Sequence, residues 1–246
     1  MILIPAIDLK DGHCVRLLRG DFATETRYTS NPQELVDRYR ALGADWLHVV
    51  DLDGARTGGP ANRDIIVGLA AQREVKLQVG GGLRDTAAIN EAFDAGVARA
   101  VVGSAALTQV QQVRQWLREF GADRIVLAFD VRLGVDGEPR VAIHGWREQS
   151  QVSLWSAVDN FADFGLRHVL CTDVSRDGAL TGPNVALYGH AVERFPRIEW
   201  QASGGIRNSL DLHALAGVGV SAAISGKALL DELIPGAELR SFLPNA

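Results

Sequence analysis

Two aspartates occupy matching places in the sequence, and the match suggests acid–base chemistry. Asp8 and Asp130 each close a short apolar run, and residues 6–9 (A-I-D-L) correspond to residues 128–131 (A-F-D-V) at a shift of 122 residues. Two carboxylates placed alike can divide a reaction, because one can remove a proton while the other supplies one. A single aspartate at a strand end more often caps a helix or loop. The matched pair favours catalysis.

Glycine-rich turns follow other apolar runs, and they are suited to binding phosphate. Ser203-Gly204-Gly205 and Ser225-Gly226-Lys227 each stand between an apolar run and a helical pattern. Glycine allows close approach of the backbone to an anion, and successive N–H groups can point towards it. The same text occurs 123 residues earlier, at 79–84 (V-G-G-G-L-R) and 102–104 (V-G-S). The sequence therefore predicts two phosphate cradles, one in each half.

Eight short apolar runs alternate with helical spacing, and they define the scaffold that must position these residues. The predicted strands span residues 2–8, 46–52, 76–80, 98–102, 125–130, 168–173, 199–203 and 222–225. This alternation and the half-chain repeat predict an α/β fold, a single eight-stranded β/α (TIM) barrel built from two duplicated half-barrels. One domain would cover 1–246, with the repeat at approximately 1–122 and 123–246. An open doubly wound sheet does not naturally explain two equal four-strand halves.

The barrel also predicts the kind of ligand. Active sites of such barrels lie at the carboxyl ends of the strands, so Asp8 and Asp130, on strands one and five, should face each other across the mouth. Eight tilted strands give a barrel roughly 15 Å across. The two cradles lie on opposite rims, so the ligand that fills both should be a small-molecule bisphosphate with its anionic ends about 15–20 Å apart.

Composition excludes several classes of partner. A net charge of −5 argues against nucleic acid, and no apolar run approaches the roughly 18 residues of a membrane span. We therefore expect a cytoplasmic protein without nucleic-acid or membrane partners. The six histidines have no metal-ligand spacing, which predicts no metal, and Cys14 and Cys171 are expected to be buried thiols.

Three further residues stand out beside these motifs. Arg16, in the first loop, could meet a phosphate, although an exposed arginine is usually solvated surface. Trp146 stands in the long loop 131–152, beside His144, Gly145 and Arg147. Its ring could stack on a flat ligand or simply anchor the loop. Thr172 places a hydroxyl where the first half has a valine, which alone could be an ordinary strand residue.

Several of these segments together resemble a known enzyme family. They are I-P-A-I-D-L-K-D-G at 4–12, R-G-D at 19–21, G-W-R-E at 145–148 and L-C-T-D-V-S-R-D-G-A-L-T-G-P-N at 170–184. This text resembles the ProFAR isomerase family of histidine biosynthesis over essentially the whole chain. The resemblance implies a duplicated barrel with no cofactor. It also implies an Amadori rearrangement that turns the aminoaldose ProFAR, which carries two phosphates, into an aminoketose.

The resemblance also assigns roles to individual residues. Asp8 resembles the general base that takes the proton from sugar C2, and Asp130 the general acid that protonates the ring oxygen. Thr172 resembles a hydroxyl that hydrogen-bonds the sugar, and Asp177 a loop acid that positions it. The remaining implied substrate contacts are Trp146, Arg16 and Arg84, with Gly81, Gly82, Gly103 and Ser104 for one phosphate and Gly178, Gly204, Gly205, Gly226 and Lys227 for the other. Ser225 stands where the family usually has valine.

Other functions stay open at this point. A dual-substrate isomerase would also act on phosphoribosylanthranilate. The paralogous cyclase barrel shares both aspartates and both cradles, but the R-G-D and G-W-R-E text argues against it. A non-catalytic bisphosphate-binding protein would not need both carboxylates. A duplicated barrel is already closed, which favours a monomer.

Overall fold

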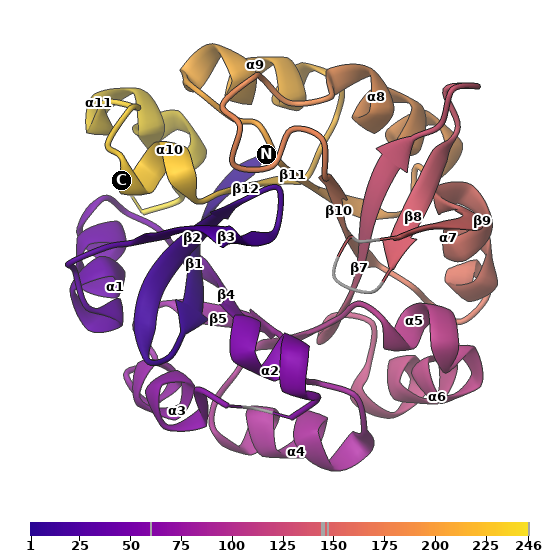
Figure 1. The fold of residues 1–246 in the computed structure, drawn as a ribbon, viewed down its shortest axis with the longest axis horizontal. Helices are drawn as coiled ribbons and strands as arrows, with labels where there is room; N and C mark the ends of the chain where they lie inside the picture. Colours follow the sequence, from indigo (N-terminus) through magenta and orange to yellow (C-terminus); the bar gives the residue numbers. More distant parts are fainter. Residues whose placement is uncertain (60, 144–145, 147, 246) are drawn as a thin grey trace.

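Eight parallel strands close into a barrel in the computed structural model, which describes residues 1–59, 61–143, 146 and 148–245. The barrel strands are β1 (Ile2–Lys10), β4 (Trp46–Asp51), β5 (Lys76–Gly80), β6 (Arg99–Val102), β7 (Ile125–Leu133), β10 (His168–Asp173), β11 (Glu199–Ser203) and β12 (Ala222–Ser225). Neighbours pair in the order β10-β11-β12-β1-β4-β5-β6-β7, and pairing of β7 with β10 closes the ring (Figure 1). The predicted fold class is confirmed.

Helices surround the barrel, because each βα unit returns the chain outside the sheet (Figure 1). The longer helices are α1 (Pro32–Ala41), α3 (Arg63–Ala71), α4 (Thr86–Asp94), α6 (Val110–Phe120), α7 (Leu154–Ala162), α8 (Val185–Arg194) and α9 (Ser209–Gly217). The short ones are α2 (Leu52–Thr57), α5 (Ala105–Thr108), α10 (Lys227–Leu230), α11 (Gly236–Leu239) and the 3₁₀ turn η1 (Arg240–Phe242). Matching helices in the two halves carry matching caps. Asn31 accepts from the Glu34 N–H at the start of α1, and Ser153 from the Ser156 N–H at the start of α7.

Two antiparallel hairpins extend the loops after β1 and β7, and the sequence pattern had indicated only loops there. They consist of β2 (His13–Leu18) with β3 (Asp21–Arg27), and of β8 (Pro139–Ile143) with β9 (Glu148–Ser153). All residues of β3 but one are exposed. Strands on a barrel rim need no continuous apolar run, so their pattern is weak. Pairing with β8 also lengthens β7 past Asp130 to Leu133.

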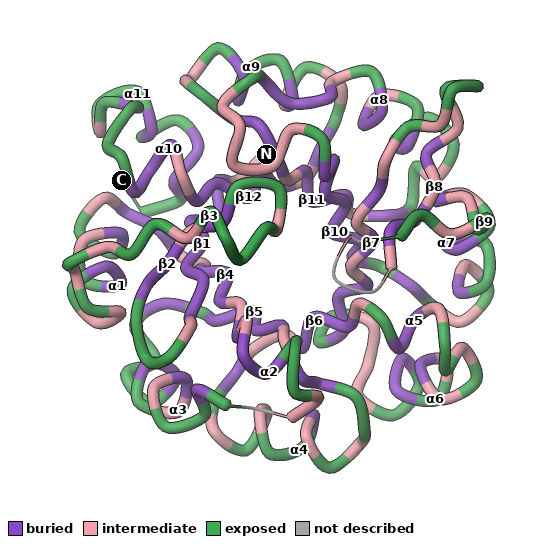
Figure 2. The backbone as a smooth tube through the Cα atoms, in the orientation of Figure 1, coloured by how far each residue is buried: buried purple, intermediate pink, exposed green. Residues whose placement is uncertain are grey.

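The core has two compartments, one between strands and helices and one inside the barrel. Along β1, Leu3, Ile7 and Leu9 belong to the larger outer cluster, whereas Ile4 and Ala6 belong to the inner one. This follows from the two-residue period of a strand. Figure 2 shows the resulting ring of buried strand residues around the centre.

The middle of the barrel also contains polar residues, which the sequence analysis did not single out. The Gln78 Nε2 group donates to Gln201 Oε1 across the barrel at 2.8 Å, and it lies 3.1 Å from His48 Nδ1. All three side chains are buried. The two glutamines are 123 residues apart, so they are counterparts in the repeat. This hydrogen bond joins the two halves below the mouth.

Candidate active site

Strand alternation carries the catalytic candidates to the mouth of the barrel. Asp8 follows Ile4 and Ala6 at two-residue spacing, so its side chain points into the barrel as theirs do. Asp130 on β7 and Thr172 on β10 lie on the inward face of their strands for the same reason. Asp130 and Thr172 are direct partners in the β7–β10 register. All three lie towards the carboxyl ends of their strands, where barrel enzymes build their active sites.

Two other strand-end aspartates have a different role. Asp51 accepts from the backbone N–H groups of Gly54, Ala61 and Asn62 and from the Asn62 side chain, at 2.7–2.9 Å. Asp173, its counterpart, accepts from Ser175 and from the Asn184 side chain. Each follows an inward residue by one position and therefore points away from the mouth. These carboxylates organise the loops after β4 and β10.

A buried arginine stands beside Asp8. The Arg16 Nη1 group donates to Asp8 Oδ2 at 2.7 Å, and its Nη2 group donates to Asp177 Oδ1 at 3.4 Å. Burial raises the pKa of Asp8, and the Arg16 guanidinium opposes part of that rise. The Arg16 Nε–H is buried and has no acceptor among the residues that the structure describes. Within the described part of the chain, this N–H is therefore a buried donor whose hydrogen bond is not made.

Asp130 has no such cation among its contacts in the described chain. The Trp146 Nε1–H donates to Asp130 Oδ2 at 2.8 Å. Burial raises the Asp130 pKa, and hydrogen bonds from Trp146 and Thr172 oppose only part of this rise. The Trp146 ring also packs on Gly20 in the β2–β3 turn, where a Cβ atom would lie 2.4 Å from its Cε3 atom. The neighbours of Trp146 named above, His144, Gly145 and Arg147, lie outside the described residues.

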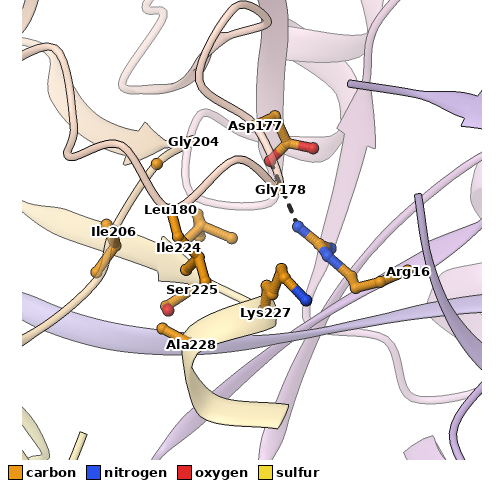
Figure 3. A pocket seen from close by; sticks show the side chains of 12 residues that line it. Arg16, Asp177, Gly178, Leu180, Gly204, Ile206, Ile224, Ser225, Lys227 and Ala228 are labelled. Carbon is orange, nitrogen blue, oxygen red and sulfur yellow. Dashed lines mark hydrogen bonds and ion pairs between the residues drawn. The ribbon is translucent and has the colours of Figure 1, made fainter. Parts of the chain in front are cut away.

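The second-half cradle forms one hollow at the mouth. Its lining contains all five residues predicted for the second phosphate, together with Arg16 and Asp177 (Figure 3). Figure 3 shows the Arg16 guanidinium pointing towards Asp177, with the Lys227 side chain close to that of Arg16. Lys227 also pairs with Asp231 at 2.8 Å. Glycine backbone and two cations therefore line one hollow, a combination that suits an anion.

The first-half cradle repeats the backbone geometry of the second. Gly81 and Gly204 have φ angles of +96° and +98°, and the glycines that follow them, Gly82 and Gly205, have +84° and +86°. A Cβ on Gly81 would lie 2.1 Å from the Asp51 carbonyl oxygen, so only glycine fits. Gly103 and Ser104 follow β6, at the start of α5.

Arg84 lies elsewhere on this rim. Its Nη2 group donates to the Ala55 carbonyl at 2.6 Å, and its guanidinium covers Gly58 in the loop after α2. The structure does not bring Arg84 to either catalytic candidate, and its substrate contact stays a prediction. No group of three or more His, Cys, Asp or Glu side chains is arranged for a metal ion in the described part of the chain.

Comparison with known proteins decides the family. The family model described as "Histidine biosynthesis protein" matches residues 2–235. The chain belongs to this family. Relatives of this histidine biosynthesis protein include proteins of Alteromonas mediterranea (44% identical), Tolumonas auensis (45%) and Vibrio cholerae (43%). Each matches over 230 residues, 94% of both chains. All three are named 1-(5-phosphoribosyl)-5-((5-phosphoribosylamino)methylideneamino)imidazole-4-carboxamide isomerase. The predicted resemblance to the ProFAR isomerases is confirmed.

Proposed function

We propose that this protein is a ProFAR isomerase, which converts the aminoaldose to the aminoketose by carboxylate acid–base catalysis. Relatives at 43–45% identity over 94% of the chain carry that name. The observation that carries the mechanism is the unlike surroundings of two carboxylates at equivalent places. Asp8 contacts a guanidinium, whereas Asp130 contacts an indole N–H and a hydroxyl.

Strand register explains this difference between the halves. Leu9 pairs with Cys14 in β1–β2, and Val131 pairs with Val141 in β7–β8. Arg16 is two residues past Cys14, so its counterpart is the residue two past Val141, which is Ile143. The first half therefore places a cation beside its carboxylate where the second half has an apolar side chain. A cation favours the charged form of a carboxyl group, and burial alone favours the neutral form.

The chemistry follows from these two environments. Protonated Asp130 gives its proton to the furanose ring oxygen, the C1–O bond breaks, and the amino nitrogen supplies the electron pair of the resulting iminium. Ionised Asp8 then removes the C2 proton, and the C–H electron pair forms the C1=C2 bond of an enaminol. Transfer of the C2 hydroxyl proton and protonation of C1 complete the aminoketose, so no proton is gained or lost overall. Each carboxylate contributes about 10²–10⁴-fold to the rate.

The phosphates supply binding energy that holds the sugar between the carboxylates. In this proposal one phosphate contacts Gly204, Gly205 and Lys227, with the Arg16 Nε–H nearby, and the other contacts Gly82 and Ser104. Arg16 thus lies between an anion and the base. The proposal requires no metal and no cofactor.

Ultraviolet turnover of ProFAR tests the function, with excess glutaminase–cyclase and ammonia to convert the product. We expect turnover by the wild type and a loss of about 10³-fold in both Asp8→Asn and Asp130→Asn. Phosphoribosylanthranilate in the same assay tests for a second substrate. Tight binding of ProFAR without turnover by the wild type would indicate a binding protein and refute the proposal.

We also propose a cytoplasmic monomer that binds neither nucleic acid nor membranes. The charge of −5 and the closed barrel support this, and no helix in the described residues is long and apolar enough to cross a membrane. Light scattering should give a mass near 26.5 kDa. Twice that mass would contradict the monomer.

A further inference from the structure

The hydroxyl of Tyr188 links the ends of two barrel strands behind the second cradle. Tyr188 stands on α8, and its side chain is fully buried. The Ser203 N–H donates to the Tyr188 hydroxyl at 3.1 Å, and the hydroxyl oxygen lies 2.9 Å from the Cys171 carbonyl and 2.7 Å from that of Ser203. Burial raises the Tyr188 pKa well above its usual value, so the phenol keeps the proton that it donates.

The two linked residues directly precede the site. Cys171 is followed by Thr172, and Ser203 is followed by Gly204. The Gly204 backbone lies close to that of Asp173, because a Cβ there would lie 2.8 Å from the Asp173 carbonyl oxygen. The Ser203 carbonyl and the Gly204 N–H belong to one planar peptide unit, so a shift of Ser203 would redirect the first N–H of the glycine pair. Tyr188 does not line the hollow itself, so any effect on a ligand must act through the backbone.

The first half lacks this link. Asn62 and Asn184 bind the counterpart carboxylates of Asp51 and Asp173, which aligns α3 with α8. Four residues further along each helix, Ile66 corresponds to Tyr188. Isoleucine has no hydroxyl, and Ile66 lines an apolar hollow behind β5 whose lining also contains Val79 and Gly81. The two cradles thus share a backbone conformation but differ in their support.

We propose that Tyr188 is a positioning residue that holds the Gly204-Gly205 turn in its phosphate-binding geometry. The assignment rests on the proposed function, because it takes this turn to be a phosphate site. The Tyr188 hydroxyl sets the relative position of Cys171 and Ser203, and through them the first N–H groups of the cradle. The first cradle does not depend on this group.

Titration with inorganic phosphate, followed by the amide NMR signals of the glycine pairs, tests the proposal in one molecule. We expect Tyr188→Phe to raise the Kd reported by Gly204 and Gly205 by about 10-fold, since a lost hydrogen bond leaves buried partners unpaired. The Kd reported by Gly81 and Gly82 should not change. Equal weakening at both pairs, an unchanged Kd at Gly204, or no phosphate binding there in the wild type would overturn the proposal.

A matched variant separates positioning from general stability. Phe161 is also a fully buried aromatic residue, on helix α7, whose βα unit carries neither cradle. Phe161→Leu should leave both phosphate Kd values unchanged even where it lowers the Tm. A loss at Gly204 in Phe161→Leu equal to that in Tyr188→Phe would overturn the assignment.

Steady-state kinetics gives a second readout. Tyr188→Phe should raise KM for ProFAR about 10-fold and change kcat by less than about threefold, because uniform binding is lost rather than transition-state contact. An unchanged KM would count against Tyr188. Absence of turnover in the wild type would refute the isomerase function, while the phosphate titration would still decide the role of Tyr188.

Discussion

Replacement of Arg16 by methionine should move catalysis to higher pH. The Arg16 guanidinium lies 2.7 Å from the Asp8 carboxylate and opposes the effect of burial on the pKa of Asp8. Methionine retains much of the apolar stem and removes the charge. Burial would then act unopposed, the Asp8 pKa would rise further, and the carboxyl group would keep its proton at neutral pH. The base would be ionised only in more alkaline solution.

The contact gives the size of the effect. The Arg16 and Asp8 side chains are only 12% and 11% exposed, so water screens the pair incompletely. Two unit charges about 4 Å apart interact by about 4 kcal/mol at an effective dielectric constant near 20. Water at the mouth of the barrel reduces this interaction energy. Each 1.36 kcal/mol that remains changes the ionisation equilibrium of Asp8 by a factor of ten. We expect kcat/KM at pH 7 to fall by about 10- to 1,000-fold.

The pH profile of kcat/KM distinguishes this effect from lost phosphate binding, because it reports the ionisation of the free enzyme. The acidic limb of this profile is the range in which kcat/KM falls because Asp8 takes up a proton. In Arg16→Met this limb should move to higher pH, and kcat/KM should partly recover as the pH rises. Arg16→Lys keeps a cation and should leave the limb near its wild-type position. An acidic limb that stays in place in Arg16→Met, with a uniformly lower rate, would refute the role of Arg16 in ionising Asp8.

Two further predictions concern the barrel interior and the contact between the two loops. Burial and the charge of a nearby arginine lower the pKa of His48 to about 4, below the unfolded value near 6.5. His48 therefore does not reduce the free energy of unfolding above about pH 6.5. Below that pH this free energy falls by about 1.4 kcal/mol per pH unit towards pH 4, because the unfolded chain binds a proton at His48 that the folded chain does not. The free energy of unfolding in urea should fall less steeply between pH 6.5 and pH 4 in His48→Gln than in the wild type. The same pH dependence in both proteins would contradict this. Gly20→Ala should displace the Trp146 indole from Asp130 and lower kcat/KM about 10-fold, whereas Gly121→Ala, also at positive φ but with open space around it, should not. Equal kcat/KM losses would contradict the packing argument.

The strands and the glycine turns of the two predicted cradles could be predicted because their signals are local. A continuous apolar run marks a strand buried on both faces, and a glycine pair marks a turn that approaches other backbone closely. The repeat doubled each of these signals. The rim hairpins were missed because exposed edge strands such as β3 need no apolar pattern. Gln78 and Gln201 were missed because a single polar residue within an apolar run does not reveal its partner.

The sequence by itself therefore determined the barrel, its duplication, the family and the two candidate carboxylates. Only the tertiary structure decided which partners those carboxylates have. Asp8 and Asp130 have the same strand position and similar flanking residues, so local sequence cannot distinguish them. The antiparallel register of each hairpin brings Arg16 to one carboxylate and places Ile143 at the counterpart position in the other half. Ionisation depends on charges within a few ångströms and on burial, and folding brings those groups together from distant parts of the chain.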